Sequence, residues 1–373
     1  MKKEIAYCGA LVIIISLWIS ATLPALAFLE PDLNSYWAFT TPTIDGHISP
    51  GEWTDAATRN FKLYMRSRGD GSLQNTLNAI LYEKNDYTNE YFAVQIFNDT
   101  YWATDFANRW KGFAMLFDNN HNGIIEQGEN GEGITTWTGS PFYSKNDLYY
   151  DAVGGLWDAD VNAGKTNDGN IKFSHTDPVN GHIGDWTFEG SIPLVGSDPG
   201  YDFNIPKAQL PKTLGFKVWF YDQANGWDGV YPDDPTINRN LDEVANGATY
   251  GTLIKHPLYY LTIMVNNPAW GTTSPVPGVY AYGYGTVVSV TALPTVGYVL
   301  DYWKLDAANV GSANPYSVTM NQNHTLTAFF KPKVIGGIST SLKQTTLIPS
   351  IALYSMMIAI FGVAISIIRR KKR

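Results

Sequence analysis

Hydrophobic and polar residues alternate with a period of two along five segments between about residue 29 and residue 257: 61–66, 91–97, 113–117, 186–192 and 216–221. This period is typical of β-strands with one buried face. Clusters of Gly, Asn and Asp separate the segments at 68–71, 167–170 and 225–229, and such clusters favour turns. No long segment has the 3.6-residue period of a helix. The pattern predicts an all-β fold, with an antiparallel β-sandwich over residues 28–257.

A smaller unit with the same β pattern follows over residues 258–332. Its strand-like segments are 261–265, 287–292 and 326–330. Residues 333–346 are rich in Gly, Ser and Thr and contain no aromatic residue, which is the composition of a flexible linker. The sequence therefore predicts a second, smaller β repeat domain followed by a linker.

The first 27 residues have the pattern of a secretory signal peptide. Lys2 and Lys3 precede an apolar run over residues 10–19, and small residues stand at 25 and 27, before the expected cleavage site. An uncleaved membrane anchor is the alternative, although the apolar run is short for a membrane span.

The other end of the chain predicts a single transmembrane helix. Residues 347–368 are 22 positions without a charge, enough to cross a hydrocarbon core of about 30 Å. Eleven of them are Leu, Ile, Val or Phe, which contribute roughly −3 to −7 kcal/mol to insertion. The basic residues at 369–373 predict a cytoplasmic tail, and hence a single-pass protein of the cell membrane with an extracellular N-terminal ectodomain. A buried core helix is the alternative, which the five basic residues disfavour.

Composition narrows the range of partners. The two predicted targeting ends contain seven of the 26 basic residues and one of the 34 acidic residues, so the rest of the chain has a formal net charge of −14. This charge repels nucleic acid phosphates and suits divalent cations. The one cysteine, Cys8, lies in the predicted signal peptide, and so no disulfide is expected in the mature chain.

Four segments, in this order, resemble family 9 carbohydrate-binding modules and their DOMON-like relatives. They are Thr43-Ile44-Asp45-Gly46 with the residues that follow to Trp53, the stretch 107–118, the stretch 187–194 and the stretch 250–253. The resemblance implies a sandwich fold, non-catalytic binding of glycan, and a sugar-stacking role for Trp110. In the second unit, residues 278–285, 290–292, 297–298, Trp303 and 325–330 resemble the divergent internalin-type B-repeat of microbial surface proteins.

The chain departs from the sugar-binding members of the first family at three places. No aromatic residue occurs between Asn238 and Ala248, where those members have a second Trp. Trp227 or Tyr231 is the substitute that a neighbouring loop offers. Ala114 stands where the family has a Glu, and residues 147–151 have no counterpart of its Arg. The resemblance therefore implies the fold more directly than the ligand.

Residues 118–129 predict a structural Ca²⁺ site. Oxygen-bearing side chains stand at positions 1, 3, 5 and 12 of this stretch and a glycine stands at position 6, the spacing of a loop that wraps oxygens around Ca²⁺. The expected ligands are the side chains of Asp118, Asn120, Asn122 and Glu129 and the backbone carbonyl of Ile124. An Asn- and Gly-rich hairpin turn without a metal is the alternative.

Nine tryptophans in the first unit are candidates for stacking against sugar rings. Trp53, Trp186 and Trp219 stand in strand or motif positions and are interpreted as core. The expected ligand-binding residues stand at loops or strand edges: Trp110, Trp157, Trp227 and Tyr231. For Trp110, packing in the core is an equal alternative to stacking.

No catalytic residue is predicted, and the chain is not expected to be an enzyme. The acidic pairs Asp158/Asp160 and Asp233/Asp234 are interpreted as solvated turn residues. The leading hypothesis is non-catalytic binding of extracellular or cell-wall carbohydrate. The alternatives are a structural or adhesive envelope protein that binds another protein, and a haem-binding electron-transfer domain that uses Met65 or Met115.

Overall fold

The computed structural model describes residues 33–104, 109–136, 147–153, 156–233 and 247–334. These residues form strands and short 3₁₀-helices, so the prediction of an all-β fold is confirmed. Within those ranges no helix is long and apolar enough to cross a membrane. The predicted signal peptide (1–27), transmembrane helix (347–368) and basic tail (369–373) lie outside the described residues.

One 15-stranded sheet contains every strand up to residue 255, in the order β10-β9-β8-β7-β13-β14-β3-β4-β5-β12-β11 with the remaining strands paired at its side. The strands on the path are β3 (Ala57–Ser67), β4 (Leu73–Asn85), β5 (Asn89–Thr100), β7 (Arg109–Asp118), β8 (Asn130–Thr135), β9 (Asp147–Asp151), β10 (Leu156–Ala159), β11 (Asn170–His175), β12 (Ile183–Pro193), β13 (Lys212–Asp222) and β14 (Trp227–Tyr231). The strands at the side are β1 (Leu33–Asn34), β2 (Tyr36–Trp37), β6 (Ala103–Thr104) and β15 (Gly251–Lys255).

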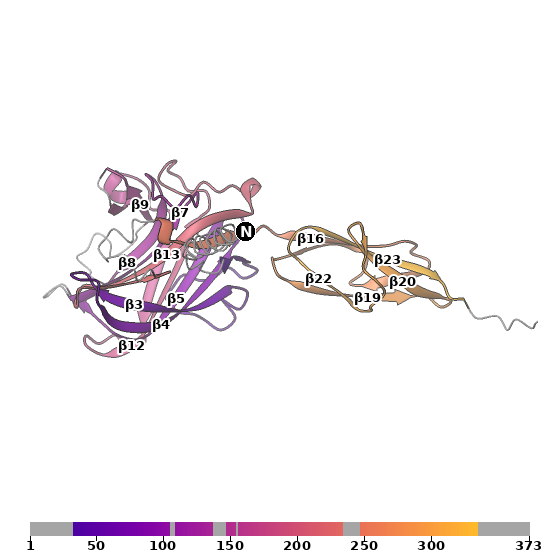
Figure 1. Cartoon of the computed structure of the whole chain (residues 1–373), viewed down its shortest axis with the longest axis horizontal. Coiled ribbons are helices and arrows are strands. Elements are labelled where there is room, and N and C mark those ends of the chain that lie inside the picture. Colours follow the sequence, from indigo (N-terminus) through magenta and orange to yellow (C-terminus); the bar gives the residue numbers. More distant parts are fainter. Residues whose placement is uncertain (1–32, 105–108, 137–146, 154–155, 234–246, 335–373) are drawn as a thin grey trace, which may run out of the picture.

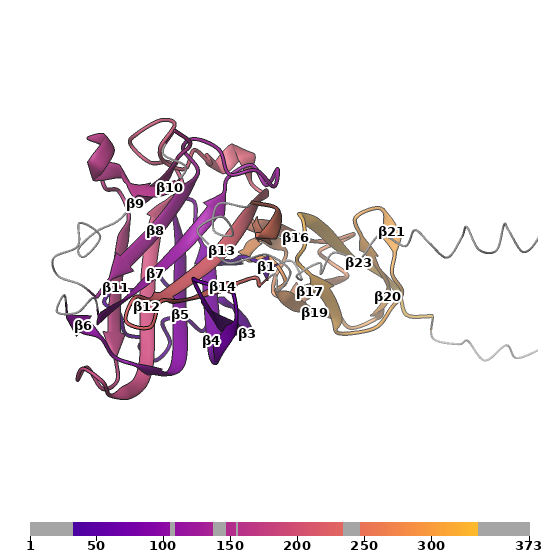
Figure 2. The same ribbon diagram turned by 60° about the vertical axis from the view of Figure 1, so that its left-hand side comes forward.

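This sheet folds over on itself into two layers (Figure 2). β14 joins the layers because it pairs with β13 on one side and, through only two residues, with β3 on the other. The layers meet through aromatic rings: Phe113 of β7 stacks on Phe188 of β12 with 4.4 Å between ring centroids. The sandwich that the alternating pattern predicts is therefore present, built from one folded sheet.

The space between the layers is filled by the inward side chains of the alternating strands. On β13 these are Leu214, Phe216, Val218 and Phe220, each at most 2% exposed. Met65 and Met115 lie in the same apolar core, so a haem beside either of them would have to displace packed side chains. Met65 and Met115 are therefore core residues of the sandwich.

A buried glutamate connects two of the segments that carry the first resemblance. One carboxylate oxygen of Glu189 accepts hydrogen bonds from the backbone N–H groups of Gly46 (2.9 Å) and His47 (3.0 Å). The other accepts the indole N–H of Trp53 at 2.9 Å. Gly46 has φ of +88° and a Cβ there would lie 2.6 Å from the backbone of Phe173, so only glycine fits this turn. Trp53 is 4% exposed, as its interpretation as a core residue predicted.

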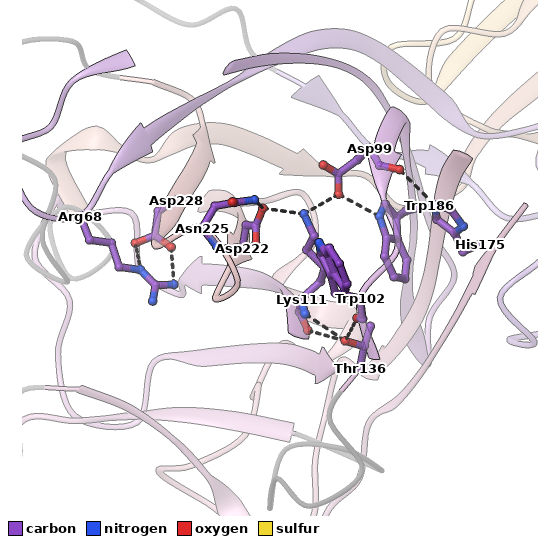
Figure 3. A network of polar contacts seen from close by, with 10 residues as sticks. All are labelled: Arg68, Asp99, Trp102, Lys111, Thr136, His175, Trp186, Asp222, Asn225 and Asp228. Carbon is purple, nitrogen blue, oxygen red and sulfur yellow. Dashed lines mark hydrogen bonds and ion pairs between the residues drawn. The ribbon is translucent and has the colours of Figure 1, made fainter. Parts of the chain in front are cut away.

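A second buried network connects the two layers (Figure 3). The ammonium of Lys111 on β7 lies 2.9 Å from Asp99 on β5 and 2.7 Å from Asp222 on β13. Asp99 also accepts the indole N–H of Trp186 at 3.0 Å, and Trp186 is fully buried, as expected of a core residue. Asp222 accepts a hydrogen bond from Asn225 at 2.7 Å. The cation thus has a carboxylate partner in each layer.

The second unit has two small sheets around its own apolar core, beyond one end of the sandwich (Figure 1). The five-stranded sheet has the order β18-β16-β23-β20-β21 and the three-stranded sheet has the order β17-β19-β22. The strands are β16 (Tyr259–Val265), β17 (Gly271–Ser274), β18 (Gly278–Tyr282), β19 (Val287–Pro294), β20 (Tyr298–Leu305), β21 (Ala308–Asn309), β22 (Tyr316–Thr319) and β23 (His324–Pro332). Trp303 is fully buried in this core and its indole N–H donates to the Ala313 carbonyl at 2.9 Å.

His256 joins the two units. Its ring stacks on Tyr284 with 3.8 Å between centroids and 6° between planes. One ring nitrogen lies 2.8 Å from Oδ1 of Asn34 in the first unit, and the other lies 3.0 Å from the hydroxyl of Tyr259 in the second. Burial lowers the pKa of His256 to about 4, so its ring is neutral at pH 7.

Candidate functional site

The outer face of the sheet formed by β8, β7 and β13 carries a row of small and aromatic residues. The strand register pairs Trp219 of β13 with Ala114 of β7, and Ala114 with Gly133 of β8. Directly paired residues have their side chains on the same face of a sheet. Ala114 and Gly133 therefore form a low floor beside the indole of Trp219.

A pocket of about 160 Å³ lies over this floor, and we call it the aromatic pocket. It is lined by Phe113, Ala114, Gly133, Ile134, Leu148, Trp157, Trp219 and Tyr221. All of these residues are apolar apart from the tyrosine hydroxyl and the two indole N–H groups. The pocket thus offers aromatic faces and a few donors, which is the usual composition of a small-molecule site.

The walls of the pocket depend on glycines in the floor. A Cβ at Gly112 would lie 1.8 Å from Cζ of Tyr221, and one at Gly133 would lie 2.8 Å from Cδ1 of Leu148. Because neither glycine has a side chain, the Tyr221 ring lies across β7 next to the Trp219 ring, with 4.7 Å between centroids. Trp219 and Tyr221 make one wall, and Leu148 and Trp157 make the other.

Polar groups stand at and beside the aromatic pocket. The indole N–H of Trp219 is buried and has no hydrogen-bond partner among the described residues. Next to Tyr221, the guanidinium of Arg68 donates two hydrogen bonds of 2.8 Å to the carboxylate of Asp228. The same guanidinium lies 5.8 Å from the centroid of the Tyr221 ring. Arg68 also donates to the side-chain carbonyl of Gln223 at 2.5 Å.

Of the four residues predicted to bind ligand, one lines the aromatic pocket, and the other residues of its lining were not predicted to bind ligand. Trp157 lines the aromatic pocket. Trp110 is half-buried and packs edge-on against Tyr221, with 5.2 Å between centroids. Trp227 and Tyr231 lie on strand β14, not on a loop, and pack into the core between the layers. Trp219, interpreted from the sequence as core, lines the pocket instead.

In the predicted Ca²⁺ loop, the side-chain oxygens accept hydrogen bonds from backbone N–H groups of the same loop. The buried Asp118 carboxylate accepts the backbone N–H of Gly123 at 2.9 Å. Asn120 and Asn122 accept backbone N–H groups two residues further on, at 2.9 and 2.8 Å. Glu129 accepts the backbone N–H of Asn119. This pattern accounts for a folded turn, and Ca²⁺ binding by Asp118, Asn120, Asn122, Ile124 and Glu129 stays a prediction.

A carboxylate cluster that the sequence reasoning missed lies on the inner face of β9. Asp147, Asp160 and Asp202 each place a carboxylate oxygen within 4.8 Å of the others. Asp160 is 1% exposed, so its interpretation as a solvated turn residue was wrong. Burial and the nearby Asp147 and Asp202 raise the pKa of Asp160 to about 9. No spacing rule could have found this set, because the three residues span 55 positions and three different elements.

The comparisons with known proteins agree with one of the two resemblances. Residues 261–334 match the family model of the divergent InlB B-repeat domain, which confirms the resemblance of the second unit. No curated protein matches the chain.

Three solved structures are similar to 61% of the chain. Two are a family 9 carbohydrate-binding module from Caldicellulosiruptor kristjanssonii, one in complex with cellotriose (11% identity, TM-score 0.37, 94% of that chain) and one with glucose (13% identity, TM-score 0.37, 96% of that chain). The third is a putative carbohydrate-binding protein from Bacteroides uniformis, at 8% identity and a TM-score of 0.31 over 98% of that chain. TM-scores below 0.5 do not establish a shared fold, so the ligand has to be argued from the pocket of this chain itself.

Proposed function

We propose that this protein is a non-catalytic carbohydrate-binding protein and that the aromatic pocket is its binding site. The observation that supports this proposal is the arrangement of Trp157, Trp219 and Tyr221 around the low floor of Ala114 and Gly133. A pyranose ring has an apolar face of C–H groups and a polar edge of hydroxyls. Aromatic walls match the first, and donors at the rim match the second.

The size of the aromatic pocket favours a short ligand segment. At about 160 Å³ it is smaller than the pockets of roughly 300–1,000 Å³ that enclose drug-sized molecules. It therefore accommodates one sugar ring, at the end of a chain or as a side branch, with the rest of the glycan in solvent.

Hydroxyl groups of such a ring would find partners beside Tyr221. Arg68 and Asp228 supply charged groups next to Tyr221, and a hydrogen bond to a charged group contributes about 1.5–3 kcal/mol.

The location of the protein is part of the proposal. A signal peptide, one C-terminal transmembrane helix and a basic tail would hold the two β units outside the cell membrane. The second unit would then act as a spacer between the membrane and the pocket, an interpretation supported by its match to a B-repeat family model.

A glycan array on the purified full-length protein, in a detergent without a sugar headgroup, tests the proposed ligand. Trp157→Ala removes one wall, and Ala114→Leu fills the pocket from its floor without removing an aromatic ring. Tyr260→Ala, at a 41% exposed residue of the second unit, is the matched control. We expect binding to at least one glycan class, lost in both pocket variants and kept in the control. Absence of binding by the wild type, or binding that survives both pocket variants, would contradict the proposal.

A further inference from the structure

Three aspartates from separate elements converge in the interior at one edge of the sandwich. Asp147 belongs to β9, Asp160 begins the 3₁₀-helix Asp160–Ala163, and Asp202 belongs to the loop that follows β12. Their exposed fractions are 2%, 1% and 7%. One carboxylate oxygen from each lies within 4.8 Å of the other two.

Hydrogen bonds within the protein use only part of the oxygens of this cluster. Asp147 accepts the backbone N–H of Asp168 at 3.2 Å, and Asp202 accepts that of Asp198 at 2.6 Å. Both carboxylate oxygens of Asp160, one of Asp202 and the amide oxygen of the fully buried Asn130 have no hydrogen-bond partner among the described residues. Asn130 belongs to the cluster because its amide nitrogen lies 3.5 Å from a carboxylate oxygen of Asp147. Three of these acceptors are carboxylate oxygens of the cluster itself, and unpaired buried acceptors indicate a ligand because buried polar groups are normally paired.

In the described ranges, no Lys, Arg or His forms an ion pair with Asp147, Asp160 or Asp202. The ion pair of Lys165 with Asp198, in the loop that also contains Asp202, is 3.9 Å long and partly exposed. Elsewhere in the same sandwich, the buried Asp99 and Asp222 share the ammonium of Lys111 as their cation. Grouping ionised carboxylates out of water is very unfavourable, so such a cluster either takes up protons or binds a cation.

We propose that Asp147, Asp160 and Asp202 bind a calcium ion. Ca²⁺ takes oxygen ligands at about 2.3–2.6 Å, so two ligand oxygens can be up to about 5 Å apart, which the 4.8 Å limit of this cluster satisfies. A 180° turn of the Asn130 amide about its last side-chain bond, a choice that the hydrogen-bond network sets, would bring a fourth oxygen toward the ion. An all-oxygen set with three carboxylates is a hard donor set and disfavours Zn²⁺ and copper.

The proposed ion would connect elements that also form the aromatic pocket. Asp147 and Leu148 are adjacent on β9 and therefore point to opposite faces of the sheet, so Leu148 lines the pocket while Asp147 faces the cluster. Trp157, in the opposite wall from Trp219, stands on β10 three residues before Asp160. Calcium would thus fix the β9–β10 edge from its inner side.

The test is thermal unfolding of the purified full-length protein at pH 8 with Ca²⁺, with Mg²⁺ or with chelator. We expect Ca²⁺ at about 100 times its Kd to raise Tm by about 5–10 °C over the chelated protein, and Mg²⁺ at the same concentration to raise it less. Asp160→Asn should abolish the Ca²⁺ shift. Asp70→Asn, at an exposed turn outside both acidic sites, is the matched control and should leave a shift of the same size.

A second measurement separates loss of the ion from loss of the fold. Because Asp160→Asn replaces a carboxyl group that has no hydrogen-bond partner among the described residues by an amide of nearly the same shape, the chelated variant should unfold at about the same temperature as the chelated wild type. A wild type whose Tm does not respond to Ca²⁺ would overturn the proposal. So would a Ca²⁺ shift that survives Asp160→Asn and disappears in Asp118→Asn, because the ion would then belong to the 118–129 loop. These outcomes are read without any glycan, so they do not depend on the proposed function.

Discussion

Removing the ammonium of Lys111 should destabilise the sandwich strongly. Lys111→Met keeps the length and apolar stem of the side chain but leaves Asp99 and Asp222, which are 8% and 2% exposed, without a cation. Removing one partner of a buried ion pair typically costs about 3–5 kcal/mol. Asp99 keeps its hydrogen bond from Trp186 and Asp222 keeps the one from Asn225, so we expect about 3 kcal/mol, the lower end of this range.

Urea unfolding followed by tryptophan fluorescence measures the loss. With an m-value of about 2–3 kcal/mol/M, a loss of about 3 kcal/mol lowers the midpoint by about 1–1.5 M. Lys62→Met, at an exposed position of β3, is the matched control and should change stability by less than about 0.5 kcal/mol. Adding Asp99→Asn and Asp222→Asn to Lys111→Met should restore much of the stability, because no buried charge is then left unpaired. If Lys111→Met were no more destabilising than Lys62→Met, the ion pairs of Lys111 with Asp99 and Asp222 would not stabilise the contact between the layers.

Two further predictions concern other buried groups. Glu189→Ala removes the acceptor for three backbone N–H groups and for the indole of Trp53, and should lower the free energy of unfolding by about 3 kcal/mol in urea. Trp53→Phe, which removes one donor, should cost less. For His256, burial lowers the pKa in the folded state to about 4 from about 6.5 in the unfolded state, so its contribution is complete above about pH 6.5 and is lost as the pH falls toward 4. We expect a loss of about 1–3 kcal/mol between pH 7 and pH 4.5 in the wild type relative to His256→Gln, and equal pH profiles for the two proteins would refute this assignment.

Local pattern was sufficient to predict five strands of the first unit, because alternation is a property of consecutive residues. Segments 113–117 and 216–221 were predicted as strands and lie within β7 and β13. The cluster at 225–229 was predicted as a turn, but strand β14 already begins at Trp227. Its glycine at 229 and its aspartate at 228 favour a turn locally, and pairing with β13 overrides that preference.

Long-range register was not available from the sequence, and the candidate site depends on it. Trp219 lies beside Ala114 because β13 pairs with β7, which is about 100 residues earlier in the chain. Nothing in the sequence around either residue predicts that the two are paired. Tyr231 was a candidate because it is aromatic and near a turn. In the structure its ring packs 4.3 Å from the ring of Phe61 in the core, because Tyr231 pairs with the inward-facing Val218.

The alternation of side chains between the two faces of a strand explains how the short strand β9 contributes to both the carboxylate cluster and the aromatic pocket. Asp147 and Leu148 are neighbours on β9, and the pleat sends the carboxylate between the layers and the leucine to the aromatic pocket. The mean hydropathy of a short window that contains both residues is intermediate, so it identifies neither the carboxylate cluster nor the aromatic pocket. Each of the two residues contacts a partner from another strand or loop: the Asp147 carboxylate lies near Asp202, and Leu148 lies near Gly133. A shift of β9 by one residue would exchange the two faces, placing Leu148 among carboxylates and Asp147 among aromatic rings, so the two sites together select a single register for this edge of the sheet.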